Sequence, residues 1–204
     1  MAVRRFATSG VRQNAPRYKD FLAGLTAMNV PGFESIATAT GTGSSDTITF
    51  SSIDQTYSSL QIRYIARAVA TGIVNVRVLF NGASTTFGSH QLMGWYTGTA
   101  DTVSASGLAN DNLYSGGYAA GTSLLASTYG VAIIDIHNYS SSTQNKTIRT
   151  FTGLELNGAA NQRVALQSAV WVSTSAVTSI SLTTNGSAFD TNSRFALYGI
   201  KAAA

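Results

Sequence analysis

Apolar and polar side chains alternate with a period of two along most of the chain from Ile36 onward. Nine segments alternate or run apolar and are rich in Val, Ile, Thr and aromatic residues: Thr47–Phe50, Leu60–Arg67, Asn75–Phe80, Gln91–Tyr96, Val131–Ile136, Thr147–Phe151, Val164–Trp171, Ser179–Thr183 and Phe195–Ile200. Ile36–Thr40 is a tenth candidate. Because successive side chains of a strand point to opposite faces, one face of each strand is expected to form the core.

The stretches between these segments carry turn signals. Asn-Gly pairs occur at Asn81-Gly82, Asn157-Gly158 and Asn185-Gly186, and this dipeptide is the strongest short signal of a hairpin turn. No helical pattern of ten residues or more follows residue 30. Many short strands without intervening helices predict an all-β fold, an antiparallel jelly-roll-like β-sandwich. A closed barrel is the alternative.

The segment Val131–Ile136 differs from the others because it is apolar on both faces. This pattern is typical of a strand that is covered on both sides or that lies in a subunit interface. Since a single chain rarely buries both faces of a sandwich strand, the segment indicates oligomerisation.

Before residue 36 the pattern changes from strand to helix. Asn14 is suited to cap a helix and Pro16 to its first turn, and four apolar side chains then share one helical face: Tyr18, Phe21, Leu22 and Leu25. Such a short helix is stable only against a surface, in its own domain or in a neighbouring subunit. The sequence therefore predicts two parts, an extended N-terminal docking arm with a short amphipathic helix at 1–35 and a β-sandwich domain at 36–204.

Charge separates the same two parts. The 204 residues carry 13 Lys and Arg against 9 Asp and Glu, a net charge of +4. The first 20 residues hold a single acid, Asp20, and five of the cations: Arg4, Arg5, Arg12, Arg17 and Lys19. The rest of the chain is neutral, so an acidic partner is expected to meet the arm. A solvated tail is one alternative, and nucleic-acid binding is not expected because the arm lacks interleaved aromatic residues.

Between Tyr96 and Tyr129 the sequence is rich in Gly, Ser, Thr, Ala and Asn, with tyrosines between them. Loops this long are often functional, and Tyr offers a large contact area at low entropic cost. The stretch predicts a recognition loop for a receptor or glycan, with four stacking residues: Trp95, Tyr96, Tyr114 and Tyr118. The alternative is a long loop that packs on its own neighbours or on another subunit.

Catalytic and metal-binding patterns are sparse. The chain has no Cys and two His, and it contains neither a G-x-S-x-G motif nor a P-loop. We therefore expect no enzyme activity, no cofactor and no metal site, the alternative being a polysaccharide-degrading enzyme that uses Asp101, Asp111 or Asp135. The longest apolar runs are shorter than the 18 residues of a membrane-spanning helix, so no membrane insertion is expected.

Five segments of the body resemble small β-sandwich virion proteins of tailed bacteriophages, notably phages of aquatic bacteria and cyanobacteria. The segments are Ser58–Arg63, Val78–Gly82, Ile133–Tyr139, Lys146–Arg149 and Ser193–Lys201. The resemblance covers about Ile36 to Lys201. It implies a structural protein of the virion, made in the host cytoplasm and commonly trimeric. The implied role is a capsid decoration (cement) protein or a tail-fibre, receptor-binding module.

The arm decides between these two roles. A tail fibre normally carries a long shaft, and this chain has neither heptads nor repeats. A cement protein needs a compact body and a segment that clasps the shell, and a cationic arm suits an acidic shell surface. We therefore expect a head decoration protein that docks on the major capsid protein, or on another virion protein, through the cations and the apolar stripe of the arm. The alternative is a tail module that recognises a host surface glycan.

Overall fold

The computed structural model describes residues 32–108 and 116–201. The chain divides at residue 32, and the unit 33–204 holds every strand described below. The predicted helix and all the proposed docking residues of the arm lie outside the described residues. No helix in the described ranges is long and apolar enough to cross a membrane.

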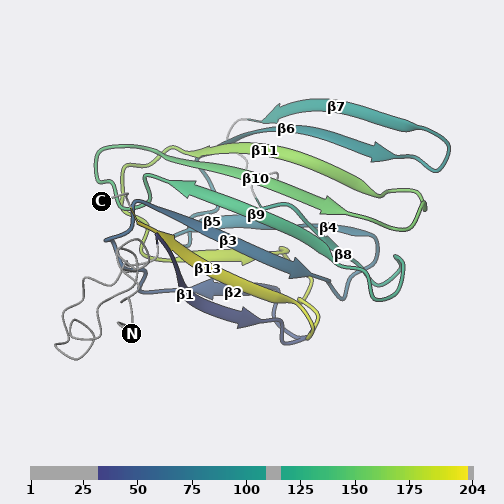
Figure 1. The fold of residues 1–204 in the computed structure, drawn as a ribbon, viewed down its shortest axis with the longest axis horizontal. Coiled ribbons are helices and arrows are strands. Elements are labelled where there is room, and N and C mark those ends of the chain that lie inside the picture. Colours follow the sequence, from purple (N-terminus) through teal and green to yellow (C-terminus); the bar gives the residue numbers. More distant parts are fainter. Residues whose placement is uncertain (1–31, 109–115, 202–204) are drawn as a thin grey trace, which may run out of the picture. The chain divides into compact units, whose positions relative to one another are not determined.

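Thirteen strands form three antiparallel sheets within these ranges (Figure 1). Their bounds are β1 Phe33–Thr40, β2 Thr47–Phe50, β3 Ser59–Ala66, β4 Ile73–Asn75, β5 Arg77–Phe80, β6 Phe87–Tyr96, β7 Asp101–Leu108, β8 Tyr118–Ala120, β9 Gly130–His137, β10 Lys146–Leu154, β11 Arg163–Trp171, β12 Ile180–Thr183 and β13 Arg194–Ile200. One sheet has eight strands in the order β1-β13-β3-β9-β10-β11-β6-β7. A second has the order β2-β12-β5, and β4 pairs with β8.

The winding of the chain is that of a jelly-roll-like sandwich. β1 and β3 belong to the large sheet, and β2 and β5 to the three-stranded sheet. Near the C-terminus β12 returns to pair with β2, and β13 inserts between β1 and β3. The structure thus confirms the predicted antiparallel β-sandwich. The large sheet ends at β1 and β7 rather than closing, so the alternative of a closed barrel is wrong for the part of the chain that the structure describes.

The core lies between the large sheet and the three-stranded sheet. It contains Ile62, Ile134 and Leu197 from the first and Phe80 and Leu182 from the second, all fully buried. Two groups of aromatic rings extend it: Phe80, Phe87 and Trp171, and Tyr64, Phe189 and Phe195. Burial of each large apolar side chain stabilises the fold by about 1.5–3 kcal/mol. We call the face of the large sheet that packs on this core the inner face and the opposite face the outer face.

Two sequence predictions fail in detail. The predicted strand at Asn75–Phe80 is divided at Val76, because the residues before it pair with β8 and those after it pair with β12. The Val76 N–H donates to the carbonyl of Gly117. The predicted single loop between Tyr96 and Tyr129 contains two strands: β7, which pairs with β6 from Ser89 to Tyr96, and β8. The alternation in β7 is hard to recognise in the sequence because its outward residues include Ala105 and Gly107, which have little or no side chain.

Candidate interaction surface

The outer face of the large sheet exposes a continuous group of apolar side chains. We call the following eight residues the apolar face: Ile65, Leu92, Val103, Val131, Ile133, Phe151, Val164 and Leu166. Each is 40–72% exposed. Directly paired residues of neighbouring strands share one side of a sheet, and the pairing runs without a shift from β3 to β7. The apolar face therefore extends over six neighbouring strands.

The strand register arranges the apolar face in two adjacent rows. The first row crosses the sheet as Ile65, Val131, Gly153, Val164, Gly94 and Val103. The second crosses it as Arg63, Ile133, Phe151, Leu166, Leu92 and Ala105. With neighbouring strands about 4.8 Å apart and same-face residues about 6.8 Å apart, these rows cover about 400 Å² of the sheet plane. An area of this size is typical of the largest apolar patch on a soluble monomer, and such patches are often functional.

Polar groups occupy the inner face behind part of this surface. Gln91, Gln167 and Thr150 form one row of paired residues on β6, β11 and β10, and all three are buried. Gln167 Nε2 donates to Gln91 Oε1 at 3.0 Å, and the Tyr118 hydroxyl donates to the same oxygen at 2.6 Å. Because Gln91, Gln167 and Thr150 take the inward positions of these strands, the larger apolar side chains next to them in the sequence point outward. The exposure of Leu92, Leu166 and Phe151 is thus fixed by the register.

A polar row borders the apolar face. Asp135 accepts from Gln61 Nε2 at 2.8 Å and lies 3.7 Å from Arg149 Nη2. Beyond Arg149 the row continues with Ser168 and His90 on β11 and β6. The His90 ring lies over Gly107, where a Cβ would approach its Cδ2 to 2.4 Å, so the glycine makes room for the imidazole. A shallow groove of about 510 Å³ runs between this row and Leu92 and Leu166.

The outer face of β1 and β13 is different in character. Its outward residues are Phe33, Ser35, Thr38 and Thr40 on β1 and Arg194, Ala196, Tyr198 and Ile200 on β13. The nearby Arg63 on β3 stacks its guanidinium over the rings of Phe33 and Tyr198, at 5.2 and 5.6 Å from the ring centres. Polar and apolar side chains are therefore mixed at this edge, and the rows of exposed aliphatic side chains end at β3.

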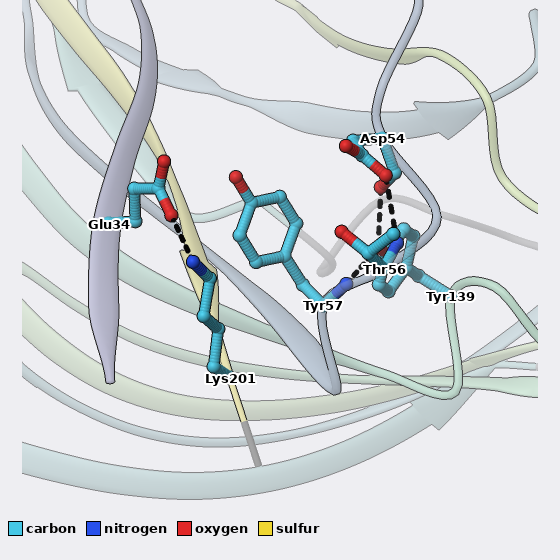
Figure 2. Close-up of polar contacts among 6 residues, drawn as sticks. All are labelled: Glu34, Asp54, Thr56, Tyr57, Tyr139 and Lys201. Atoms are coloured by element: carbon cyan, nitrogen blue, oxygen red, sulfur yellow. Dashed lines mark hydrogen bonds and ion pairs between the residues drawn. The ribbon is translucent and has the colours of Figure 1, made fainter. Parts of the chain in front are cut away.

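A separate polar cluster ties the end of β13 to neighbouring segments (Figure 2). Lys201 Nζ forms an ion pair with Glu34 on β1 at 2.7 Å, and the Tyr57 ring lies beside them. The Tyr139 hydroxyl donates to the backbone oxygen of Asp54 at 2.5 Å and accepts from the Tyr57 backbone N–H at 3.1 Å. Burial raises the pKa of both tyrosines, and the hydrogen bond to Glu34 raises the pKa of Lys201. These contacts hold the segment before β3 in place.

The predicted glycan-stacking residues do not form one exposed platform. Tyr118 is buried on β8 beneath the Arg163 guanidinium, which lies 5.2 Å from the ring centre, so the prediction of a surface role for Tyr118 is wrong. Tyr114 lies outside the described residues. Trp95 and Tyr96 are half-buried at the end of β6, and both line a second shallow groove of about 220 Å³ with Asp101, Glu155 and Arg163.

In the described residues no group of three or more His, Asp or Glu side chains is placed to hold a metal ion. In comparisons with known proteins, no family model, no curated protein and no solved structure matches this chain. Function is therefore inferred from the surface itself. The sequence indicated the apolar face at one strand only, through the two-sided apolar pattern of Val131–Ile136.

Proposed function

We propose that this chain is a structural protein of a tailed-phage virion, a capsid decoration protein that works by assembly with other protein subunits. The observation that carries the proposal is the apolar face, eight exposed apolar side chains on one uninterrupted sheet surface. Water contact with these side chains is unfavourable, and a flat sheet face is removed from water by packing on another protein surface. Jelly-roll bodies are common in viral capsids, which agrees with the resemblance in the sequence.

In this proposal the two parts of the chain have different tasks. The arm carries the cations Arg4, Arg5, Arg12, Arg17 and Lys19, which steer it to an acidic surface of the major capsid protein or of another virion protein. The apolar stripe of the arm then adds buried contact area. The sandwich supplies a rigid body with the apolar face for contacts between subunits.

The location on the particle is tested by immunogold electron microscopy. Antibodies against the purified chain are applied to phage particles purified on a density gradient from the lysate in which the chain is made. The proposal predicts gold on the head surface. Gold on the tail tip supports the second candidate function below, and particles that carry none of the chain contradict both.

The role of the arm is tested by rebinding to particles stripped of the chain. A full-length variant with Arg4→Gln, Arg5→Gln, Arg12→Gln and Arg17→Gln should lose most of its binding and most of its salt dependence. A matched control replaces four arginines of the body by Gln: Arg63, Arg77, Arg149 and Arg194. Equal binding of the two variants contradicts the arm as the docking element.

One observation favours the second candidate, a tail module that binds a host surface glycan. The groove at the end of β6 combines the half-buried rings of Trp95 and Tyr96 with the carboxylates of Asp101 and Glu155. Aromatic faces and carboxylate acceptors are the groups that bind sugar rings and their hydroxyls. A screen of the purified chain against bacterial surface polysaccharides tests this role, and binding that Trp95→Ala abolishes supports it.

A further inference from the structure

The position of the midline of the apolar face suggests what covers the face. Its six strands follow the order β3-β9-β10-β11-β6-β7, so the middle of the face lies between β10 and β11. A two-fold axis that runs parallel to the strands above this midline keeps every residue row at its own height. It places β10 of one copy over β11 of the other, β9 over β6, and β3 over β7. We infer that a second copy of this chain packs on the apolar face about this axis.

The register gives the facing residues in this arrangement. In the second row, Phe151 faces Leu166 of the second copy, and Ile133 faces Leu92 of the second copy. In the first row, Ile65 on β3 faces Val103 of the second copy on β7. Apolar side chains therefore meet in three of the six facing pairs, and in the first row Val131 and Val164 face Gly94 and Gly153 of the second copy. Packed sheets lie about 10 Å apart, which side chains of this size fill.

The charged groups of the outer face also fit a second copy. In the bordering polar row, Asp135 on β9 faces His90 of the second copy, and Arg149 faces Ser168 of the second copy. Arg63 faces the small side chain of Ala105. Among the described residues of these three rows, from β3 to β7, no cation faces a cation. A two-fold contact requires such self-complementarity because the same surface serves both partners.

The available area is sufficient for a stable dimer. A fourth row, Ser59, His137, Thr147, Val170 and Gly88, lies beyond the polar row on β3, β9, β10, β11 and β6. Together with the three rows that reach β7, it spans about 750 Å² of the sheet plane, close to the about 800 Å² that each partner buries in a standard interface. The axis leaves β13 and β1 outside the overlap, and the rows of exposed aliphatic side chains also end at β3.

This inference goes beyond the proposed function and replaces the trimer that the resemblance implies with a two-fold dimer. A trimer uses two different surface patches at each contact, whereas the apolar face is complementary to itself. Dimerisation is measured on the purified chain and particle location on phage, so each can fail without the other.

The first test is the mass of the full chain at micromolar concentration, by sedimentation equilibrium. The wild type should have twice the mass of a single chain. Leu166→Lys should be a monomer, with dimer affinity reduced by at least 100-fold. Leu125→Lys is the matched control, because Leu125 is 47% exposed against 50% for Leu166 but lies outside the large sheet. This control should remain a dimer.

The second test is the register of the contact, and it uses the absence of cysteine from the sequence. Ile133→Cys and Leu92→Cys are prepared separately, mixed, and treated with a short bis-maleimide cross-linker. In the proposed dimer each new thiol faces the other variant across the about 10 Å between packed sheets, which is too far for a direct disulfide but within reach of the cross-linker. Identical thiols are displaced sideways by a further about 14 Å, across three strand spacings, and lie beyond its reach. The mixture should give covalent dimers, and each variant alone should give far fewer.

Circular dichroism tests whether Leu166→Lys is folded. If this variant is unfolded, Phe151→Ser, at the centre of the apolar face, takes its place and should also be a monomer. A wild-type monomer or trimer, a dimeric Leu166→Lys, or cross-links that form equally well in the separate variants would each overturn the inference.

Discussion

The two parts of the outer face belong to the same sheet but present different chemistry to the surroundings. Over β1 and β13 half of the outward residues are Ser, Thr or Arg, and the Arg63 guanidinium lies over the two aromatic rings, Phe33 and Tyr198. From β3 to β7 the first and second rows consist of Val, Ile, Leu and Phe, apart from Arg63, Ala105 and two glycines. Secondary structure, strand direction and sheet membership are the same in both parts. The difference shows that the apolar residues are not needed to form the sheet, and it points to a partner over β3 to β7 only.

The largest expected effect distinguishes the inner from the outer face at two adjacent isoleucines. Ile134 is fully buried in the core, while Ile133 is exposed on the apolar face. Ile134→Ala should lower the free energy of unfolding by about 2–5 kcal/mol, because it leaves a cavity. Ile133→Ala should lower that of the monomer by less than about 1 kcal/mol. Urea unfolding at submicromolar concentration measures both, and equal losses would contradict the assignment of the two faces.

A buried lysine gives the next largest effect. Lys146 on β10 is fully buried, and its ammonium donates to three backbone carbonyls, those of Ser141, Gln144 and Ser173, at 2.6, 2.8 and 3.3 Å. Burial lowers its pKa. Lys146→Met should cost about 1–3 kcal/mol of unfolding free energy, because these carbonyls lose their donor. Lys201→Met, at an exposed ion pair, is the control; a smaller loss for Lys146→Met than for Lys201→Met would contradict this role.

Alkaline pH tests the inner face of β3. Burial strongly raises the pKa of the Tyr64 phenol, whose hydroxyl donates to the Gly116 carbonyl at 2.8 Å. Above pH 10 the unfolded chain releases this proton and the folded chain keeps it, so the free energy of unfolding falls as the pH rises. The loss attributable to Tyr64 is about 1.4 kcal/mol per pH unit.

Unfolding in urea at pH 9 and pH 11, for the wild type and for Tyr64→Phe, isolates this contribution. Other groups titrate in the same range, among them Tyr139, but they are present in both proteins. The pH dependence should be weaker in Tyr64→Phe. An unchanged pH dependence would show that the phenol is accessible to water.

The smallest effect is expected at the polar border of the apolar face. Arg149 and Asp135 form an exposed ion pair at 3.7 Å. Arg149→Gln should change the free energy of unfolding by less than about 0.5 kcal/mol, since exposed ion pairs contribute little. It should also leave the dimer intact, because Arg149 faces Ser168 rather than a carboxylate in the proposed contact. A loss above 1 kcal/mol would mean that this border is more deeply packed than its exposure indicates.

The positions of most strands can be predicted from the sequence, but for several strands the side that points to the core cannot. Alternation predicts β9, β10, β11 and β13 within one to three residues at each end. In β11, however, hydrophobicity favours Val164 and Leu166 for the core over Ala165 and Gln167, and the structure has the opposite orientation. The orientation is set by Trp171, which packs in the core, and by the Gln91 and Gln167 pair. These are contacts between distant segments that local periodicity does not contain.

The candidate surface was predictable at one strand and not as a whole. In Val131–Ile136 the sequence is apolar at both odd and even positions, which predicts two apolar sides. The structure places Val131 and Ile133 on the apolar face. Val103 lies in a stretch of Ser, Thr, Gly and Ala that gave no clear strand signal, so β7 and its part of the face were missed. Six strands form one surface only after the pairing is known, because β6 pairs with the distant β11 rather than with β5, and β7 joins the sheet through β6.

The central claim is that the apolar face is covered in the working form of the protein. Hydroxyl-radical labelling with mass spectrometry measures the solvent exposure of single side chains in the full chain, at concentrations below and above assembly. Phe151, Leu166 and Leu92 should lose most of their labelling on assembly, while Leu125 should keep it. Equal labelling of Phe151 and Leu166 in both states would contradict the claim.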